Sequence, residues 1–285
     1  AVAYHLATGE TDIGFPNAFG AYDDDTKVML DMKPRDPSFE GIVYDHHLYD
    51  PPYPNPQYKF KLIYSQICGT DAVFSVFKSK IPKDQLWKLV VGYAGDGQMD
   101  KVPPEILTPD LFIERVYYSY DKGNYSYPIW SLLSGAINAL CRVRKETMAY
   151  ELLRTAKSPE EIISDPSVES ARDDLKKEIN RVLKSTVIYR SGPVVWAVID
   201  SRYRINGRIA EMLSENHLRT VIVINKYDNS LSGRGPLCNV LVEKFEFLGG
   251  HEGYIGGYVT DSNLRDLILS IKRGGGIVEP DSSTE

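Results

Sequence analysis

Residues 41–47 read Gly-Ile-Val-Tyr-Asp-His-His, an apolar run that ends in a carboxylate and two imidazoles. A short apolar run of this kind is typical of a strand that lies buried in a parallel sheet. In open α/β sheets, ligands bind just beyond the carboxyl ends of the strands. The stretch therefore predicts an α/β fold with a site at Asp45, His46 and His47.

Further apolar runs surround this stretch and read as strands of the same sheet. Val2–Leu6 and Lys27–Asp31 come before it, and residues 90–96 follow a Pro-rich stretch that can continue neither a strand nor a helix. The second run ends at Asp31, and the last ends at Asp96 within Gly-Asp-Gly. We therefore expect both aspartates beside the first site. Helical patterns occupy residues 71–79 and 83–89.

The second half of the chain predicts a connecting helix and a second domain. Residues 109–155 read mostly helical, with a tyrosine-rich interruption at 117–127. Residues 167–185 carry apolar side chains at helical spacing among many charges, which predicts an exposed helix between two domains. In the second domain we expect strands at 193–199, 220–224, 240–247 and 254–259 and helices at 207–214 and 262–272.

The expected architecture is α/β, with two domains and a cleft between them. The tail is mostly Gly, Pro, Ser and acidic residues, which predicts disorder. We expect a parallel-sheet catalytic domain at residues 1–165, a connecting helix at 166–188, a smaller α/β domain at 189–273, and the tail at 274–285.

The composition is that of a globular protein, with 42% hydrophobic and 25% charged residues among 285. The longest apolar runs, such as Val194–Ile199, fall far short of the roughly 20 residues that a membrane helix needs. Residues 1–7 lack the basic start and the cleavage site of a signal peptide. We therefore expect a cytoplasmic protein that has no membrane contact.

Charge and cysteine usage limit the kinds of ligand. The net charge of −6 argues against a broad basic face that coats long nucleic acid, so any polyanion would be held locally. Cys68, Cys141 and Cys238 lie far apart and lack CxxC spacing, which predicts buried free thiols rather than disulfides or a zinc site.

The triplet Asp45-His46-His47 has the chemistry of a divalent-metal site. A carboxylate neutralises the charge of the cation, and an imidazole nitrogen suits metals of intermediate softness. Three residues alone are a weak signal. The signal strengthens because Asp31 and Asp96 end other predicted elements, and because Gly249-Gly250-His251 lies in the second domain.

With these four motifs in this order, the sequence resembles the DHH phosphoesterase family. The resemblance covers nearly the whole chain and is to the branch with a DHH-associated C-terminal domain, which includes RecJ-like exonucleases, oligoribonucleases and cyclic-dinucleotide phosphodiesterases. It implies that Asp31 bridges two metal ions, usually Mn²⁺, and that His46 and Asp96 are ligands of one of them. It also implies that His47 lies near the scissile phosphate, with Asp45 as the catalytic-site carboxylate that orients the imidazoles.

The first motif of the family, His-x-Asp-x-Asp-Gly, departs from its pattern here. Its nearest match is residues 8–14, where Thr8 replaces the His, Glu10 replaces the first Asp, and only Asp12 matches. Either Glu10 and Asp12, with His5 as a further candidate, complete a reduced metal site, or one metal position is weak and the protein binds without cutting. The acidic run at residues 23–25 reads as a solvated turn.

The second domain carries candidates for substrate binding. By the resemblance, Gly249 and Gly250 allow a phosphate or sugar to approach the backbone, and His251 donates to a phosphate oxygen. Arg234 stands where the family has Arg-Ser, although Gly235 replaces the Ser. A guanidinium forks naturally onto phosphate. Three more arginines, Arg202, Arg204 and Arg208, read either as solvated surface or as a local phosphate grip.

The predicted function is that of a two-metal phosphodiesterase or exonuclease. Two cations about 4 Å apart can activate a shared water and stabilise an in-line transition state. The substrate would be single-stranded DNA or RNA, or short oligonucleotides, cut to nucleoside 5′-monophosphates with two Mn²⁺ ions, or with Mg²⁺ as the alternative. Two further readings stay open: a cyclic or linear dinucleotide phosphodiesterase, and a catalytically weakened relative that binds nucleic acid or protein in a replication or repair complex. A protein partner or a homodimer also stays open.

Overall fold

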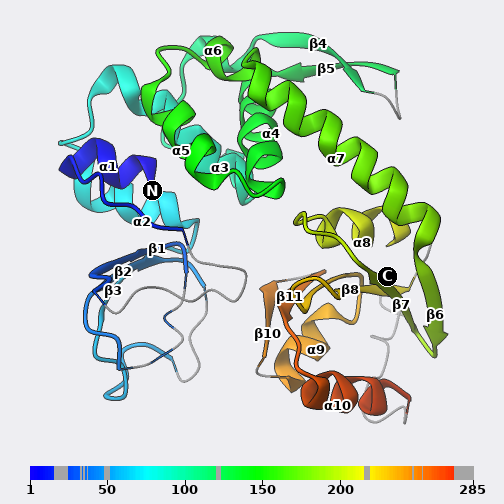
Figure 1. The fold of residues 1–285 in the computed structure, drawn as a ribbon. Helices are drawn as coiled ribbons and strands as arrows, with labels where there is room; N and C mark the ends of the chain where they lie inside the picture. The colour runs from blue at the N-terminus through cyan, green and yellow to red at the C-terminus, as the bar shows by residue number, and fades with distance from the viewer. Residues whose placement is uncertain are drawn as a thin grey trace, which may run out of the picture. The chain divides into compact units, whose positions relative to one another are not determined.

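The computed structural model describes residues 1–15, 25–32, 34, 36, 38–47, 52–119, 123–214, 219–245, 247–251 and 253–272. The chain forms two compact units (Figure 1). Unit 1 consists of Ala1–Cys141 and Lys145–Ala171, and unit 2 consists of Arg142–Arg144 and Arg172–Glu285. Helices and a parallel sheet confirm the predicted α/β class. Asp23, Asp24 and the tail at residues 274–285 lie outside the described residues.

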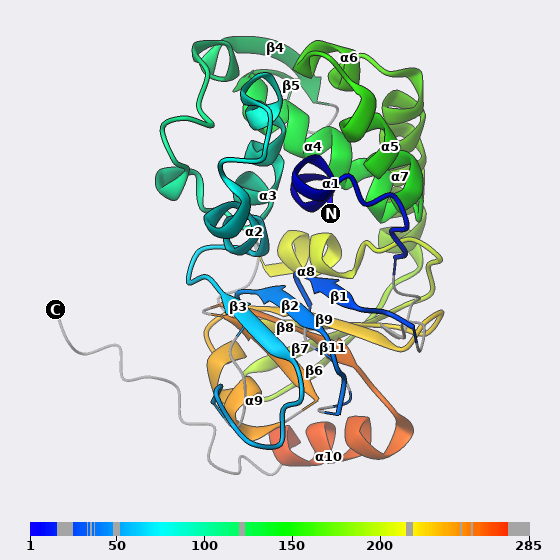
Figure 2. The same ribbon diagram turned by 90° about the vertical axis from the view of Figure 1, so that its left-hand side faces the viewer.

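Unit 1 is built around a parallel sheet in which β2 lies between β1 and β3 (Figure 2). The strands are β1 (Val28–Leu30), β2 (Ile42–Asp45) and β3 (Lys61–Tyr64). Met29 and Val43 pack in a core with Phe39 and Phe60. The strands predicted around residues 27–31 and 41–45 are confirmed, whereas β3, with the short apolar run Leu62-Ile63-Tyr64, was not predicted.

Helices make up most of the rest of unit 1. In α4, buried residues such as Ile129, Leu133, Ala136 and Leu140 recur at helical spacing, which explains why this stretch is a helix. The helices are α1 (Val2–Thr8), α2 (Gly69–Phe77), α3 (Val90–Gly95), α4 (Ile129–Arg142), α5 (Glu146–Thr155) and α6 (Pro159–Ile163), with 3₁₀ helices at Lys83–Leu89, Met99–Lys101 and Pro109–Phe112.

Two segments of unit 1 that were expected to be strands are helices. Residues 2–6 lie in α1, where the Tyr4 ring packs against Tyr44 and Phe77. Residues 90–95 form α3, in which Val90 and Tyr93 are buried three residues apart on one face. A short buried apolar run has the same composition in either form, so its pattern does not separate the two.

The tyrosine-rich interruption is a β-hairpin. Strand β4 (Glu114–Ser119) pairs antiparallel with β5 (Gly123–Pro128). Residues 120–122 between them lie outside the described part of the chain.

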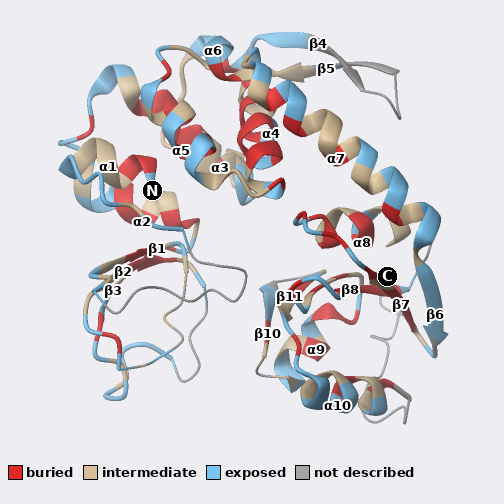
Figure 3. Ribbon diagram, viewed as in Figure 1, coloured by how far each residue is buried: buried red, intermediate tan, exposed pale blue. Residues whose placement is uncertain are grey.

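Unit 2 contains a six-stranded sheet in the order β10-β11-β9-β8-β7-β6. Only β7 and β8 run parallel among its described strands, and Figure 3 shows that these two are almost wholly buried. Helix α8 lies on one side of the sheet, and α9 and α10 lie on the other (Figure 1). The elements are β6 (Val187–Ser191), β7 (Val194–Ile199), α8 (Asn206–Ser214), β8 (Thr220–Asn225), β9 (Ser230–Arg234), α9 (Cys238–Lys244), β10 (Leu248–His251), β11 (Tyr254–Tyr258) and α10 (Asp261–Lys272).

Several expectations for unit 2 need correction. Residues 240–247 were expected to form a strand, but α9 occupies Cys238–Lys244 because Cys238 and Leu241 are buried three residues apart on one helix face. Strand β9 was not predicted, since Ser and Gly are poor strand formers. Cys68 and Cys238 are buried as predicted, whereas Cys141 is half-buried.

No helix in the described part of the chain has the length and apolar character to cross a membrane.

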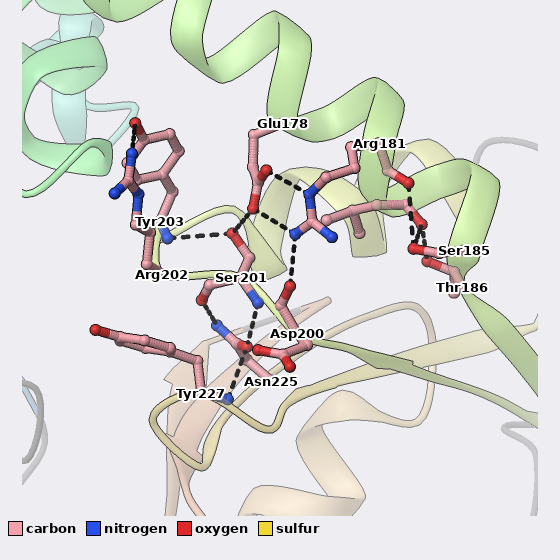
Figure 4. A network of polar contacts seen from close by, with 11 residues as sticks. Glu178, Arg181, Ser185, Thr186, Asp200, Ser201, Arg202, Tyr203, Asn225 and Tyr227 are labelled. Atoms are coloured by element: carbon pink, nitrogen blue, oxygen red, sulfur yellow. Dashed lines mark hydrogen bonds and ion pairs between the residues drawn. The ribbon is translucent and has the colours of Figure 1, made fainter.

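Helix α7 (Pro166–Ser185) is fastened to the unit 2 sheet by polar contacts (Figure 4). Ser201 Oγ donates to Glu178 Oε1 at 2.7 Å, and Arg181 Nη2 donates to the carbonyl of Asp200 at 2.7 Å. Asn225 accepts from the Ser201 amide at 3.0 Å and donates to the Ser201 carbonyl at 2.7 Å. These contacts tie the second half of α7 to the carboxyl ends of β7 and β8.

The short segment Arg142–Arg144 also belongs to unit 2. The Arg142 carbonyl accepts from the Arg204 amide at 2.9 Å. Arg144 donates to the Arg202 carbonyl and forms an ion pair with the buried Asp228. Unit 2 is therefore made of two separate stretches of sequence.

Candidate functional site

Asp45 organises the end of β2. Its side chain is fully buried, and its Oδ1 accepts from the His46 amide at 2.8 Å. Nδ1 of His47 lies 2.6 Å from the same oxygen. Because an ionised carboxylate can only accept, His47 donates from Nδ1 and keeps the lone pair on Nε2. The carboxylate therefore sets which nitrogen of His47 can bind a cation.

Asp31 stands at the carboxyl end of β1, next to His46. Its Oδ1 is 3.2 Å from His46 Nε2, and its amide donates to the Tyr44 carbonyl at 2.8 Å. Its φ of 60° lies in the left-handed region, which Asp tolerates better than most residues. A Cβ added to Gly69, the first residue of α2, would lie only 2.5 Å from Asp31 Oδ1. The glycine therefore makes room for this carboxylate.

Asp96 reaches the site from a helix, not from a strand. It follows α3, and its Oδ2 is 4.0 Å from His46 Nε2. Helix α3 is held by Tyr93, whose hydroxyl donates to Asp71 Oδ1 at 2.7 Å, while Ser65 donates to Asp71 Oδ2 at 2.8 Å. Burial and the Asp71 carboxylate raise the pKa of Tyr93. Sequence reasoning missed this supporting triad, which no motif marks.

The charges around His46 favour a cation at this place. The hydrogen bond with Asp31 raises the pKa of His46, burial opposes the rise, and the charges of Asp31, Asp96 and Asp45 add to it. Ligand atoms of Asp31, Asp45, His46 and His47 all lie within 4.8 Å of one another. Carboxylate oxygens with imidazole nitrogens fit a divalent metal ion such as Mn²⁺ or Zn²⁺.

Glu10 and Asp12 are not brought into this cluster. Both are exposed, and Glu10 Oε1 accepts from the amides of Thr11 and Asp12, each at 2.8 Å. The Glu10 carboxylate is thus used within its own turn. The segment before them is the helix α1 instead of the expected strand. Their role as metal ligands stays a prediction that the geometry does not support.

The substrate-binding candidates of unit 2 meet at one end of its sheet. Strand β11 pairs with both β9 and β10, which places Tyr254 opposite Arg234 on one side and His251 on the other. The Arg234 guanidinium lies over the Tyr254 ring, 4.4 Å from its centre. Gly249 and Gly250 precede His251 on β10.

Gly250 has a structural reason to be glycine. Its φ is 155°, and a Cβ there would collide with the backbone of Tyr254. At Gly249 a Cβ would meet nothing within 4 Å, so the surface beside it is open.

Among solved structures, the chain is similar to RecJ proteins. It matches RecJ from Thermus thermophilus in complex with Mn²⁺ with a TM-score of 0.52 and 13% identity, over 87% of this chain and 44% of that chain. The Mg²⁺ complex of that protein gives 0.48 and 13% over 89% and 44%, and an exonuclease RecJ bound to manganese gives 0.45 and 14% over 85% and 70%. No protein-family model and no curated protein matches the sequence.

The first of these matches shows that the two chains share a fold. The chain spans less than half of the length of the Thermus protein.

Proposed function

We propose that the protein is a metal-dependent phosphodiesterase that hydrolyses single-stranded nucleic acid or short oligonucleotides to nucleoside 5′-monophosphates. The observation that carries the proposal is the convergence of Asp31, Asp45, His46 and His47 within 4.8 Å. The shared fold with a RecJ protein solved with Mn²⁺ supports it.

The chain offers groups for each part of this reaction. Asp31 and His46 would hold the metal, with Asp96 as a further ligand from α3. Bound metal would lower the pKa of its water and polarise the phosphate. Asp45 holds the His47 imidazole and the His46 backbone amide, which would leave His47 Nε2 to bind a metal ion or to accept a proton.

Unit 2 would hold the phosphates of the substrate. Arg234 supplies a guanidinium at the end of β9, and Gly249, Gly250 and His251 of β10 lie two strands away. The peptide groups of Gly249 can be approached closely because no neighbouring atom covers the position of a Cβ.

A binding protein of weakened activity is the second candidate. It is favoured by the Glu10 carboxylate, which is satisfied by Thr11 and Asp12 amides and is not placed at the cluster. In this case the protein would bind single strands and cut them slowly or not at all.

To test the proposal, the protein is incubated with Mn²⁺ and end-labelled DNA or RNA of several lengths, including dinucleotides, and the products are identified. Asp31→Ala should abolish release of mononucleotides because it removes the carboxylate that faces His46. Glu40→Ala is the matched control, since Glu40 is an exposed carboxylate just before β2, at the opposite end of the sheet. Preference for dinucleotides would identify a dinucleotide phosphodiesterase. Activity retained in Asp31→Ala would contradict the proposed site.

A further inference from the structure

One face of strand β11 presents two exposed tyrosine rings. Ile255 packs in the core with α9 and α10, so Tyr254, Gly256 and Tyr258 lie on the opposite face of the sheet. This is the face on which α8 packs against β8 and β9. Tyr254 is 47% exposed and Tyr258 is 38% exposed.

The surface between the two rings is bare backbone. Gly256 lies between them on β11 and pairs with Gly249 of β10, where a Cβ would meet only open space. Four residues of strand span about 13 Å, whereas stacked bases rise about 3.4 Å. A ring can stack only on a base whose face is not covered by a neighbouring base, so two bases on these rings belong to an unstacked single strand rather than a duplex.

Positive charge gathers beside Tyr254. Arg234 lies over its ring, and Arg142 lies near enough that the charges of Arg208 and Arg234 act on it. In the part of the chain that the structure describes, the carboxylate that acts on both Arg142 and Arg234 is Glu211, which pairs with Arg208 at 3.1 Å. Nε of Arg234 is buried and makes no hydrogen bond within the described part of the chain. Among the described residues, these three guanidiniums carry more positive charge than the Glu211 carboxylate beside them, as a phosphate site requires.

A hollow lies at the other end, beside Tyr258. Its volume is about 220 Å³, and its lining includes Arg204, Asn206, Ser230 and Ser232. It is smaller than the roughly 300–1,000 Å³ of pockets that enclose whole ligands, so it suits a single ring. Asn206 donates to Ser230 Oγ at 2.6 Å. The Ser230 hydroxyl donates to Asp228 Oδ1, so the hydroxyl of Ser232 is the one that offers a polar contact to the edge of a base.

We propose that Tyr254 and Tyr258 form a stacking track for two bases of an extended single strand, with Arg234 on a phosphate of that strand. Aromatic rings beside guanidinium groups are the general means by which proteins hold single strands without reading their sequence. That the ligand is a nucleic acid rests on the proposed function. The track adds Tyr254 and Tyr258, which belong to no motif, to the residues that would bind it.

Fluorescence anisotropy of the full chain with labelled oligo(dT) tests the track. EDTA keeps the strand uncut, so binding is measured apart from catalysis. Stacking of one base is worth a roughly five- to 150-fold change in affinity, so Tyr258→Ala should weaken binding by that factor. Tyr258→Phe should bind like the wild type because it keeps the ring. Tyr189→Ala is the matched control, since Tyr189 is 56% exposed in β6 at the other edge of the sheet.

An abasic strand of the same length separates stacking from charge. The wild type should bind it more weakly than oligo(dT), and Tyr258→Ala should cause no further loss on it. Equal binding of both strands by the wild type, or full affinity in Tyr254→Ala and Tyr258→Ala, would overturn the track. Loss of affinity only in Arg234→Ala would do the same, because charge alone would then explain binding. Failure of hydrolysis with Mn²⁺, with tyrosine-dependent binding intact, would count against the proposed function and leave the track standing.

Discussion

At the scale of single residues, the candidate site depends on side chains that position others. The buried Asp45 holds the His47 ring and the His46 amide, and Gly69 leaves space for Asp31. Both residues are buried and act by fixing the positions of other side chains. Their substitution therefore tests how the site is held in place, apart from the chemistry of the metal ligands.

Asp45→Asn should lower the affinity for Mn²⁺ roughly 10- to 100-fold, the usual cost of losing a partner that orients a metal-binding histidine. An amide has one acceptor oxygen of lower charge, and its NH₂ cannot accept from His47. Isothermal titration of the purified protein with Mn²⁺ measures the change. Asp100→Asn is the control, since Asp100 is exposed and pairs with Lys101. Equal affinity in both variants would remove Asp45 from the site.

Gly69→Ala should both destabilise the protein and weaken Mn²⁺ binding. The new methyl group would lie within 3 Å of three atoms of Asp31, and forcing an extra carbon into a packed place costs about 1–3 kcal/mol. Gly135→Ala is the contrasting variant, because Gly135 is exposed in α4 with nothing within 4 Å of a Cβ. It should stabilise the helix by roughly 0.5–1 kcal/mol. Urea unfolding measures both, and a stabilised Gly69→Ala would contradict the close contact.

At the scale of elements, burial determines whether a segment forms a helix or a strand. It also determines how reactive the buried side chains of that segment are. Cys238 begins α9 and is fully buried in the unit 2 core. Burial raises the pKa of its thiol from 9.0 to about 11. The thiol should therefore be inert while the element is folded.

Stability should fall as the pH rises from about 9 towards 11. In this window the unfolded chain loses the Cys238 proton while the folded chain keeps it, so the folded state binds more protons. One such group changes the unfolding free energy by up to about 1.4 kcal/mol per pH unit. Urea unfolding of the wild type and of Cys238→Ala should show a shallower slope in the variant. Iodoacetamide should label the half-buried Cys141 before Cys238, and the reverse order would contradict this burial.

Element type could be predicted where burial leaves a periodic pattern. The spacing of charges and apolar residues predicted α7, and continuous apolar runs predicted β2, β7 and β8. The same criterion failed for α1, α3 and α9, because short apolar runs do not separate a strand from one or two helical turns. Tertiary packing made the choice there, as the contacts of Tyr4 with Tyr44 and Phe77 illustrate.

The candidate site was predictable to the extent that it depends on the sheet. Parallel strands place Asp31, Asp45 and the two histidines at one edge, and the structure brings these together. Asp96 arrives from α3, a route that the sequence did not indicate. Glu10 was aligned by spacing to a motif, but local amides hold its carboxylate. Tyr254 and Tyr258 belong to no motif, and only strand register places them on one face.

At the scale of the whole molecule, each unit contains a hydrophobic cluster of its own. The unit 1 sheet is packed around Val43, and the unit 2 sheet around residues such as Ile222 and Leu231. Two cores can unfold in two transitions, so one free energy of unfolding need not describe the protein.

Asn225→Ala should destabilise unit 2 by at least about 2 kcal/mol. Asn225 is fully buried, and its loss leaves the amide and the carbonyl of Ser201 without the partners they now have. Trp196 reports on unit 2, and Trp87 reports on unit 1. Asn138→Ala, at an exposed position of α4, is the control. Urea unfolding followed through Trp196 and through Trp87, each in a background whose other two tryptophans are replaced by Phe, should show the Trp196 transition shifted and the Trp87 transition unchanged. Equal shifts would mean that the units unfold together.

The segment Arg142–Arg144 has a consequence for how this chain can be divided or recombined. It belongs to unit 2 but precedes Lys145–Ala171, which belong to unit 1. A single cut in the sequence therefore cannot release either unit whole: a fragment that starts at Arg172 would lack Arg144, and Asp228 would lose its buried counter-charge. During synthesis, part of unit 2 leaves the ribosome before unit 1 is complete. To exchange one unit between two related genes, recombination would have to cut on both sides of Arg142–Arg144 as well as near Arg172. We therefore expect the two units to be inherited together.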